Sequence, residues 1–598
     1  MDKYDFYTGN SFDAYEFMGA HIVNGGVMFR TYAPNAAAVS VIGEFNGWEE
    51  QPMERIDNFY ELFVPGAREG MMYKYRIHEG SGRVIDHCDP YGFGMELRPN
   101  TASIIRDLNA YKFGDQKWMK SRTNRMNEPL NIYELHAGSW RRKENGDFYS
   151  YTELGELLIP YLLENGYNYI EFLPLAEHPC DESWGYQVTG FFSPTSRYGT
   201  AAELMELVDM LHRNNIGVIM DYVPVHFAVD DYGLAYYDGT ALYEYPSTDV
   251  GYSEWGSHNF MHSRGEVRSF LRSAANYWLG EYHFDGLRMD AIRNLIYWNG
   301  DEARGVNDGG VRFLQSMNDG LRSRHKGVML IAEDSTAYKG VTAPTSEGGL
   351  GFDYKWDMGF MHDTFSYFQS DTEERAAAYN RLTFSMMYFY DEKYILPFSH
   401  DEVVHGKASV IQKMNGDYDK KFPQARALYM YMYAHPGKKM NFMGNELGQF
   451  REWDESREQD WCLLDYPIHR GFARFMRDIC LVYMNHPALY AKDYPRGGFR
   501  WLICKDDGSC VYAFERMGGG ERIAAVFNLS DEPRTAELDL KARALRLIIA
   551  TENTVYGGGT EYETDAELLP DGGAFRIEMP PQSGCLYEVL AQDKPAKT

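Results

Sequence analysis

Short apolar segments alternate with longer amphipathic segments from about residue 130 to residue 443. Eight apolar segments have the length and composition of buried strands, and they are residues 131–136, 169–175, 217–222, 286–292, 328–333, 352–355, 394–398 and 439–443. The segments between them, such as residues 201–212 and 267–279, have the apolar spacing that is typical of helices. Strands that alternate with helices form parallel sheets, and eight such units close into a barrel. The sequence therefore predicts an α/β fold with a central (β/α)8 barrel.

Strand-and-turn patterns flank this central region on both sides. The predicted strands before it are residues 27–32, 39–43, 60–64 and 73–77, which indicate a small β-sandwich. The predicted strands after it are residues 511–514, 522–528 and 583–588, which indicate an antiparallel β-domain. We therefore divide the chain into a polar lead (1–14), a β-sandwich (15–112), the barrel (113–492) and a C-terminal β-domain (493–598). We expect the tail after Leu590 to be frayed.

Composition and motif content argue against several classes of partner. A net charge of −28 disfavours nucleic acid and anionic membranes. No stretch approaches the roughly 18 apolar residues of a membrane span, and residues 1–10 lack the apolar core of a signal peptide. The seven cysteines form no CxxC pair or Cys/His cluster, and no compact Asp/Asn loop suits calcium. We therefore expect a cytoplasmic protein without a metal or other cofactor.

Aromatic residues make up 15% of the chain, and two explanations for this high share remain open. Exposed aromatic rings would suit flat apolar ligand faces such as those of sugar rings. A thick core with large loops would account for the same composition. Trp48, Tyr73 and Tyr75 could bind sugar rings in the N-terminal sandwich, and core packing is at least as compatible with each of them.

Polar residues follow the predicted barrel strands at the points where the strands end. They are Asp221, His226, Arg288, Asp290, Glu333, His400 and Asp401. In a barrel the carboxyl ends of the strands converge on one mouth. A single strand-end aspartate often caps the next helix, but several carboxylates at successive ends repel one another without a functional reason. This pattern predicts an active site.

Paired carboxylates in such a mouth fit the cleavage of glycosidic bonds, which needs one ionised and one protonated carboxyl. Arg288, two residues before Asp290, would keep that aspartate ionised, although a purely structural Arg–Asp pair has the same pattern. Glu333 follows the apolar residues 329–332, so we expect burial to keep it protonated. If the two groups lie about 5–5.5 Å apart, the reaction retains configuration through a covalent intermediate.

Four segments that contain these residues resemble the signature regions of the α-amylase family of glycoside hydrolases. They are residues 221–226, 286–292, 332–335 and 398–402, in the family's order. The resemblance implies that Asp290 is the nucleophile, Glu333 the general acid/base, and Asp401 a third carboxylate that grips sugar hydroxyls. The residues that it implies hold the sugar at the cleavage point are Arg288, His226 and His400, with Asp221 in support.

Within that family the chain most resembles the 1,4-α-glucan branching enzymes. The segments that carry this resemblance are residues 133–140, 177–179, 183–190, 349–359, 399–407 and 444–449. Trp184 and Tyr186 match positions at the cleavage subsite, where the Tyr186 ring would stack on a sugar. A buried tyrosine bonded through its hydroxyl is the alternative. Residues 89–103 are similar to the family's N-terminal glucan-binding module, while Phe360 departs from its usual tryptophan.

The resemblance implies a transglycosylase of glycogen biosynthesis. Such an enzyme cleaves internal α-1,4 bonds of glycogen, amylose or maltooligosaccharides and transfers the cut chain to a 6-hydroxyl, by retaining double displacement. It implies no cofactor or metal and an α-glucan as the partner, and we expect a monomer. Composition and spacing do not separate transfer from hydrolysis, so a debranching or trehalose-releasing hydrolase remains an alternative. A catalytically dead glucan-binding scaffold is disfavoured by the presence of Asp290, Glu333 and Asp401.

Overall fold

A computed structural model describes residues 1–591, and it confirms the predicted (β/α)8 barrel. Its eight strands follow one another in chain order round a closed barrel. They are β10 (Asn131–Leu135), β11 (Tyr169–Phe172), β14 (Gly217–Tyr222), β17 (Gly286–Met289), β18 (Met329–Ala332), β19 (Tyr354–Trp356), β20 (Tyr394–Phe398) and β21 (Lys438–Phe442). The tail from residue 592, part of the segment expected to be frayed, lies outside the described residues.

The strands that carry the predicted site are parallel and buried along their whole length. Strand β17 pairs with β14 on one side and with β18 on the other, so that Arg288 lies opposite Asp221 and opposite Ile331. Every residue of the three strands is buried. Because a parallel sheet is covered on both faces, its side chains are normally apolar. A charged residue in these strands therefore needs a partner, which Arg288 finds in Asp221.

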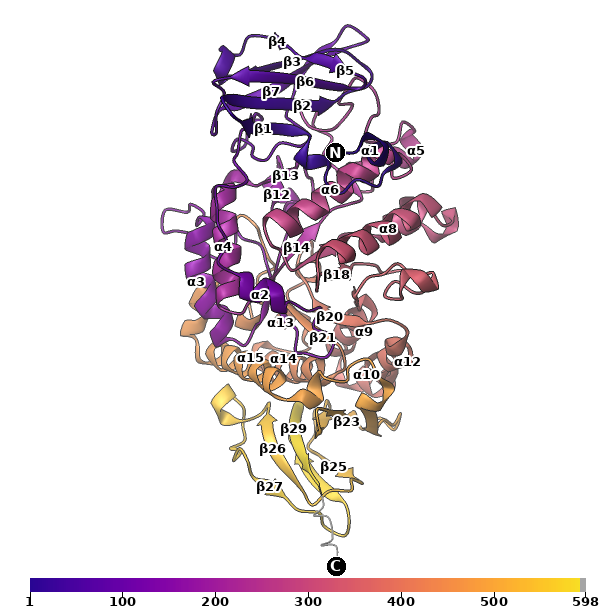
Figure 1. Cartoon of the computed structure of the whole chain (residues 1–598). Coiled ribbons are helices and arrows are strands. Elements are labelled where there is room, and N and C mark those ends of the chain that lie inside the picture. The colour runs from indigo at the N-terminus through magenta and orange to yellow at the C-terminus, as the bar shows by residue number, and fades with distance from the viewer. Residues whose placement is uncertain (592–598) are drawn as a thin grey trace, which may run out of the picture. The chain divides into compact units, whose positions relative to one another are not determined.

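The described residues form two compact units, one of residues 1–124, 136–159 and 171–353, the other of residues 125–135, 160–170 and 354–591. In the first unit the predicted helices are present as α4 (Ala201–Arg213) and α6 (Gly265–Glu281), and α8 (Asp308–Arg324) precedes β18 (Figure 1). Helix α4 begins with a capping box between Thr200 and Glu203, which satisfies the free amides of its first turn.

A buried histidine near the end of α4 joins this helix to the start of β17. His212 Nδ1 lies 2.8 Å from Asp115 Oδ2, and its Nε2 lies 3.0 Å from Asp285 Oδ2. Burial alone would lower the pKa of His212, but the carboxylates of Asp285 and Asp115 outweigh it and raise the pKa to about 9. The cluster therefore holds a protonated imidazole at neutral pH.

The N-terminal region is the β-sandwich that the sequence predicts. Its sheets are β1-β2-β6-β5 and β4-β3-β7-β8, with β9 paired to β7. The bounds are β1 (Gly19–Val23), β2 (Gly26–Tyr32), β3 (Ala36–Gly43), β4 (Gln51–Pro52), β5 (Glu54–Ile56), β6 (Phe59–Pro65), β7 (Met72–Glu79), β8 (Val84–His87) and β9 (Ser103–Ile104). Tyr73 and Tyr75 are fully buried and donate hydrogen bonds to Asp89, so they belong to the core and cannot stack on a sugar. Trp48 is 39% exposed.

The polar lead is not an unstructured segment, because residues Lys3–Thr8 form helix α1. The Asp2 side chain accepts hydrogen bonds from the Tyr4 and Asp5 amides and so caps the helix. Phe6 is buried, and α1 packs against α6. The helix is short and mostly polar, so its stability comes from this docking, which the local sequence does not reveal.

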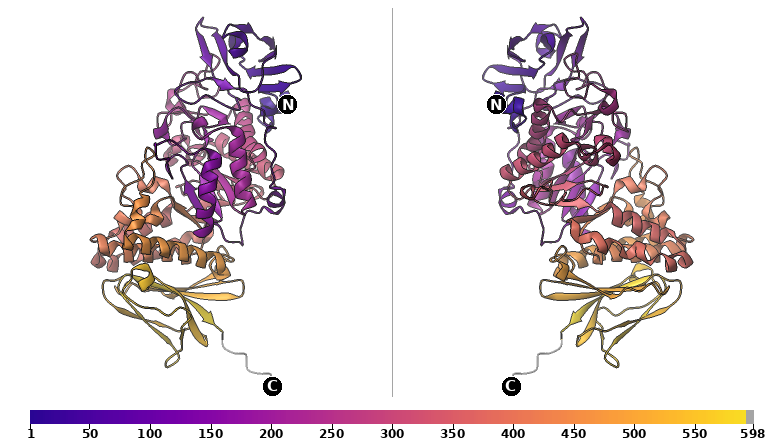
Figure 2. Two further views of the ribbon diagram at one scale, coloured as in Figure 1. Left: turned by 90° about the vertical axis from the view of Figure 1, so that its left-hand side faces the viewer. Right: turned by 90° about the vertical axis from the view of Figure 1, so that its right-hand side faces the viewer.

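The C-terminal β-domain in the second unit also follows the prediction. Its main sheet has the order β22-β23-β24-β29-β26-β27, beside a β25-β28 pair. The bounds are β22 (Phe499–Ile503), β23 (Val511–Gly518), β24 (Glu521–Asn528), β25 (Arg534–Leu538), β26 (Ala544–Ala550), β27 (Glu567–Leu568), β28 (Phe575–Met579) and β29 (Ser583–Leu590). Helices α14 (Tyr418–Ala434) and α15 (Pro467–Asn485) lie side by side, and α14 packs against β29 (Figures 1 and 2).

Two further properties of the described residues bear on the expectations from composition. No helix among them is long and apolar enough to cross a membrane. All seven cysteines lie within residues 1–591, and the structure has each of them as a free thiol.

Candidate active site

Strand β17 ends one residue before Asp290, and the chain turns sharply after it. The Asp290 amide donates to Tyr222 O at 3.0 Å, which extends the contact with β14 by one residue. Ala291 then has a φ of 49°, in the left-handed region. The prediction of one strand over residues 286–292 is therefore wrong beyond Met289, because the turn breaks the period of two. Asp290 consequently lies where the strand opens into a loop, which is the usual place for barrel catalysis.

Arg288 is the centre of the charged network in the first unit. Its Nη1 donates to Asp221 Oδ2 at 2.8 Å and to Asp290 Oδ1 at 3.0 Å, and its Nη2 lies 3.4 Å from Glu333 Oε2. The residue is only 2% exposed. Burial would lower the pKa of the guanidinium, but the neighbouring carboxylates, Asp221 foremost, raise it well above its usual range. One permanent cation thus joins three carboxylates from three adjacent strands.

The two carboxyl groups that sequence reasoning paired share this guanidinium. The Asp290 side chain is 14% exposed and that of Glu333 is 24% exposed. Glu333 Oε2 also accepts a hydrogen bond from the Ala291 amide at 2.6 Å. The expected burial of Glu333 is therefore incomplete, because its carboxyl projects beyond the last buried residue of β18, Ala332. Both groups are accessible enough to meet a substrate, and neither is in bulk solvent.

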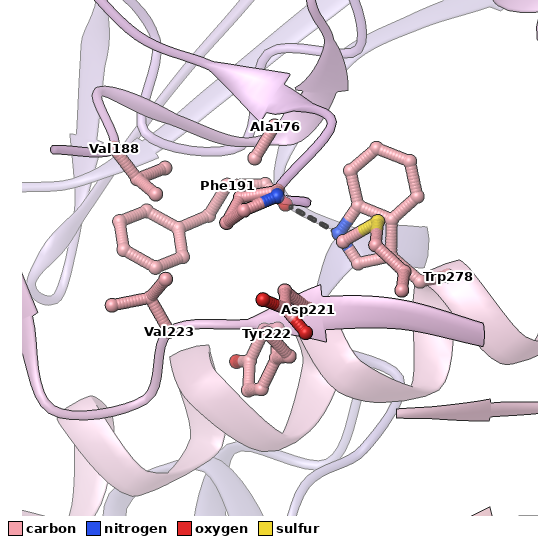
Figure 3. A pocket seen from close by; sticks show the side chains of 9 residues that line it. Ala176, Val188, Phe191, Asp221, Tyr222, Val223 and Trp278 are labelled. Carbon is pink, nitrogen blue, oxygen red and sulfur yellow. Dashed lines mark hydrogen bonds between the residues drawn. The ribbon is translucent and has the colours of Figure 1, made fainter. Parts of the chain in front are cut away.

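Asp221 lies deeper than the other two carboxylates. Its side chain is fully buried at the end of β14, and Figure 3 places it close to Val223, Phe191 and Trp278. The cavity beside it measures only about 10 Å³, which is room for a single water. A sugar cannot reach this carboxylate, so the arrangement suits Asp221 to orienting Arg288 rather than to contacting substrate.

Tyr186 joins the same network from the loop after β12 (Ala176–Glu177). Its hydroxyl donates to Asp221 Oδ2 and accepts from Arg288 Nη1 at 3.3 Å. Its ring is half-buried, and Arg288 Cζ lies over it at 6.0 Å from the ring centroid. The bonded hydroxyl agrees with one of the two sequence interpretations of this residue. Trp184, two residues earlier, is also half-buried and has a left-handed backbone, with φ 55°.

His226 follows β14 at the start of β15 (His226–Phe227) and is 2% exposed. Burial lowers its pKa to about 4, so the ring is neutral at neutral pH. Among the described residues its Nδ1 has no hydrogen-bond partner, and the exposed ring of Trp255 lies 5.2 Å away. A buried nitrogen without a partner beside an exposed aromatic ring can bind a sugar hydroxyl.

In the second unit, the predicted site residues His400 and Asp401 directly follow β20 and Ser399. His400 Nδ1 lies 2.5 Å from Glu134 Oε1, and the His400 amide donates to Glu134 Oε2 at 2.8 Å. Glu134 is fully buried in β10. This carboxylate fixes the orientation and tautomer of the imidazole.

Asp401 is more exposed than the carboxylates of the first unit, with half of its side chain accessible. Lys407 Nζ lies 3.1 Å from Asp401 Oδ2 and 3.2 Å from Glu402 Oε1, and it also donates to Asp401 O at 2.8 Å. Burial would lower the pKa of Lys407, but Asp401 and Glu402 raise it on balance. The ammonium therefore stays charged and holds the loop around Asp401.

Sequence reasoning did not assign Glu134 and Lys407 to the site. Glu134 carries a detectable signal, since a glutamate inside an otherwise apolar predicted strand needs a buried partner. Lys407 lies in a segment that was used only for family resemblance. Its role depends on a loop conformation that residue spacing does not determine.

Two curated relatives decide the family. The chain is 44% identical over 532 residues to the 1,4-alpha-glucan branching enzyme GlgB of Geobacillus stearothermophilus, covering 87% of this chain and 83% of the relative. It is 44% identical over 545 residues to the enzyme of the same name from Bacillus caldolyticus, covering 89% and 82%. The chain belongs to the GlgB branching-enzyme family. The resemblance drawn from the sequence motifs is thereby confirmed.

Other comparisons agree with the architecture of a GlgB family member. Three family profiles match: carbohydrate-binding module 48 (isoamylase N-terminal domain) at residues 17–92, the α-amylase catalytic domain at 115–242, and the α-amylase C-terminal all-β domain at 501–589. The solved structure of a pullulanase from Bacillus acidopullulyticus superposes with a TM-score of 0.74 at 18% identity, covering 96% of this chain and 74% of that one. At this identity the superposition shows a shared fold.

Proposed function

We propose that this protein is a 1,4-α-glucan branching enzyme that acts in glycogen biosynthesis. It cleaves internal α-1,4 bonds of a glucan and transfers the cut chain to a 6-hydroxyl, which creates an α-1,6 branch. The observation that carries the proposal is the contact of one buried guanidinium, Arg288, with both Asp290 and Glu333. A family member that lacked activity would have no reason to keep this arrangement of charges at strand ends.

In the first half of the reaction, Asp290 Oδ2 attacks the anomeric carbon of the donor chain. Its other oxygen, Oδ1, is held by Arg288 Nη1 at 3.0 Å, which orients the carboxylate and keeps it ionised. The bond between the anomeric carbon and O4 of the leaving chain breaks while Glu333 gives its proton to that O4. The products of this step are a covalent glycosyl-enzyme and a shortened chain with a free 4-hydroxyl.

In the second half, the 6-hydroxyl of another glucan attacks the same anomeric carbon from the face that the leaving chain vacated. Glu333 is now ionised and takes the proton of that hydroxyl, while the bond to Asp290 breaks. Two displacements retain the α configuration. The bonds broken and formed are alike in energy, so the step balances without a nucleotide or a metal.

The remaining residues of the site do not react themselves. They hold Arg288 or the sugar in place. Asp221 and Tyr186 hold Arg288 in place. The buried Asp221 carboxylate accepts a hydrogen bond from Arg288, and the Tyr186 hydroxyl bonds to both of these charged groups. The half-buried ring of Tyr186 offers a face to the sugar. We assign His226 and His400 to sugar hydroxyls, because His226 Nδ1 has no hydrogen-bond partner among the described residues and Glu134 holds the His400 ring in one orientation.

Asp401 and Trp184 complete the proposed site. Asp401 is the third carboxylate, which grips sugar hydroxyls at the cleavage point, and its half-exposed side chain suits that contact. Trp184 contributes an aromatic face from the Tyr186 loop. For the whole protein we propose a cytoplasmic monomer with the catalytic domain at residues 113–492, a glucan-binding module at 15–112 and a C-terminal β-domain at 493–598.

The decisive experiment incubates the enzyme with amylose and measures both linkage type and reducing ends. Branching creates α-1,6 linkages, visible by NMR, without a proportional rise in reducing ends, and the iodine colour of the glucan fades. A steady release of glucose, maltose or trehalose would instead identify a hydrolase. Asp290→Asn, which keeps the shape of the side chain, should abolish the new linkages; full activity in this variant would refute the catalytic assignment.

A further inference from the structure

A second polar hollow, apart from the carboxylate network, lies in the first unit where α1, α6 and α8 come together. Helix α6 packs against both α1 and α8 (Figure 1). The hollow measures about 440 Å³, which is within the usual range for small-molecule sites. Within the described part of the chain, the ionisable side chains that line it are three arginines, Arg268, Arg272 and Arg312. We refer to it as the arginine hollow.

The innermost of these arginines is buried without a counter-ion. Arg272 is 3% exposed, and its hydrogen bonds go to neutral acceptors: the Gly9 carbonyl, the Asn10 amide oxygen at 3.4 Å and the Ser316 hydroxyl. Its Nε has no hydrogen-bond partner among the described residues. Burial, together with the charges of Arg268 and Arg324, lowers the pKa of Arg272 to about 10. A buried cation with a free donor is costly unless an anion meets it.

The second arginine, Arg268, also donates its hydrogen bonds to neutral acceptors. It donates to three backbone carbonyls, those of Thr8 at 2.8 Å, His262 at 3.2 Å and Ser263 at 2.8 Å. These bonds fix the guanidinium but leave its charge, and its pKa is lowered by burial, with only a partial offset from Glu266. Glu266 itself accepts a hydrogen bond from the Tyr32 hydroxyl.

The third arginine, Arg312, lies on α8 with its side chain exposed at the rim of the hollow. Among the described residues, none of Arg268, Arg272 and Arg312 forms an ion pair with a carboxylate. Arg324, whose charge also acts on Arg272, lies 4.0 Å from Asp13. Three arginines without an ion-pair partner in one hollow contrast with a chain whose net charge is −28.

From this arrangement we propose that the arginine hollow binds a phosphate monoester. Guanidinium groups match the geometry of phosphate oxygens and bind them with charge-assisted hydrogen bonds. Arg272 supplies the buried Nε–H donor, Arg268 a second fixed charge, and Arg312 closes on the phosphoryl group from the rim. The volume exceeds what a lone phosphate fills, so a phosphorylated monosaccharide fits, with Asn10 and Ser263 available to sugar hydroxyls. The site is separate from the proposed branching chemistry and does not depend on it.

The test is isothermal titration of the full chain with glucose 6-phosphate, inorganic phosphate and glucose. We expect glucose 6-phosphate and inorganic phosphate to bind saturably and glucose to give no heat of binding. Comparing the affinities of the two phosphate ligands shows whether the sugar contributes to binding. Arg312→Glu should weaken phosphate binding at least about tenfold, because it reverses a charge at the rim. Its thermal midpoint and its activity on amylose should match those of the unmodified chain, because Arg312 is exposed and outside the branching site.

The matched control is Arg474→Glu, which makes the same change at a half-exposed arginine of α15 that does not line the hollow. It should leave phosphate binding unchanged. A second variant, Arg272→Gln, removes the buried donor and should abolish binding where it folds. Equal binding by the Arg312→Glu and Arg474→Glu variants would overturn the proposal, and so would the absence of saturation with both phosphates.

Discussion

Replacing Arg288 by lysine separates the charge of this residue from its forked geometry. The guanidinium uses Nη1 for Asp221 and Asp290 and Nη2 for Glu333. A lysine has one nitrogen on a flexible stem, so it can neutralise Asp221 but cannot also hold Asp290, the proposed nucleophile, and Glu333, the proposed acid/base, at fixed positions. We therefore expect Arg288→Lys to fold normally and to branch slowly.

The expected loss follows from the contacts that lysine cannot make. Losing one hydrogen bond to a charged group costs about 1.5–3 kcal/mol, which corresponds to a rate decrease of about 10- to 150-fold. The contact to Glu333 at 3.4 Å is the longest of the three and the first to be lost. Because the two reacting carboxyls are displaced rather than the outer glucan contacts, the decrease should fall on kcat more than on KM.

The companion variant Arg288→Met removes the charge itself. Asp221 has a fully buried side chain, and it would lose a cation at 2.8 Å. Leaving one member of a buried ion pair without its partner costs about 3–5 kcal/mol. We therefore expect a clearly lower thermal midpoint for Arg288→Met and a nearly unchanged midpoint for Arg288→Lys.

The assay measures branching of amylose by NMR, with kcat and KM from initial rates and thermal midpoints by calorimetry. Arg474→Met serves as a control, since Arg474 is half-exposed and lies 3.9 Å from Asp478; it should change neither quantity. Normal kcat in Arg288→Lys would show that the fork does not position the carboxyls. An unchanged midpoint in Arg288→Met would show that Asp221 does not depend on this cation.

Three further predictions concern the same unit. Tyr186→Phe keeps the ring but removes the hydroxyl that donates to Asp221. The activation free energy should rise by about 1–3 kcal/mol, so kcat on amylose should fall while KM changes little. Arg197→Met leaves Glu177 buried without its ion-pair partner at 2.7 Å, and calorimetry should show a destabilisation of about 3–5 kcal/mol. The raised pKa of His212, about 9 when folded, gives stability that is present below the unfolded value of 6.5 and is lost as pH rises through about 9; denaturation across this window should show the loss, and His212→Gln should flatten it.

The barrel could be predicted from the sequence because its signal is local. The predicted strands at residues 217–222 and 394–398 coincide with β14 and β20, since each is a short apolar run closed by a turn. Helix α1 could not be predicted, because a short polar helix is stable only when it packs against α6 and buries Phe6. The predicted strand at residues 286–292 was too long for a similar reason. The left-handed turn at Ala291 is imposed by its surroundings, and an alanine in the sequence does not indicate such a turn.

The sequence indicated which residues to consider for the candidate site, but it did not indicate most of the contacts between them. Arg288 and Asp290 are two residues apart, so their pairing is visible in the sequence. The bond from Arg288 to Asp221 spans 67 positions, and the one from His400 to Glu134 spans 266. Sequence patterns place such residues at strand ends, but which residue is buried and which faces the mouth depends on packing between strands. For this reason Asp221 could be predicted to lie at a strand end, but how deeply its side chain is buried could not be predicted.

The depth of Asp221 gives a physical reason for having three carboxylates around one guanidinium. In the proposed cleavage step Asp221 and Asp290 are ionised and Glu333 carries the proton that it gives to the leaving chain, so the group that they form with Arg288 has one net negative charge. Cleavage of a glycosidic bond passes through an oxocarbenium-like state whose positive charge develops next to Asp290. A fixed negative surplus in a partly buried site stabilises that charge without reorganisation during the reaction. Asp221 adds to the surplus from a position that no sugar can reach, so it strengthens the field at the anomeric carbon and cannot compete with Asp290 as a nucleophile.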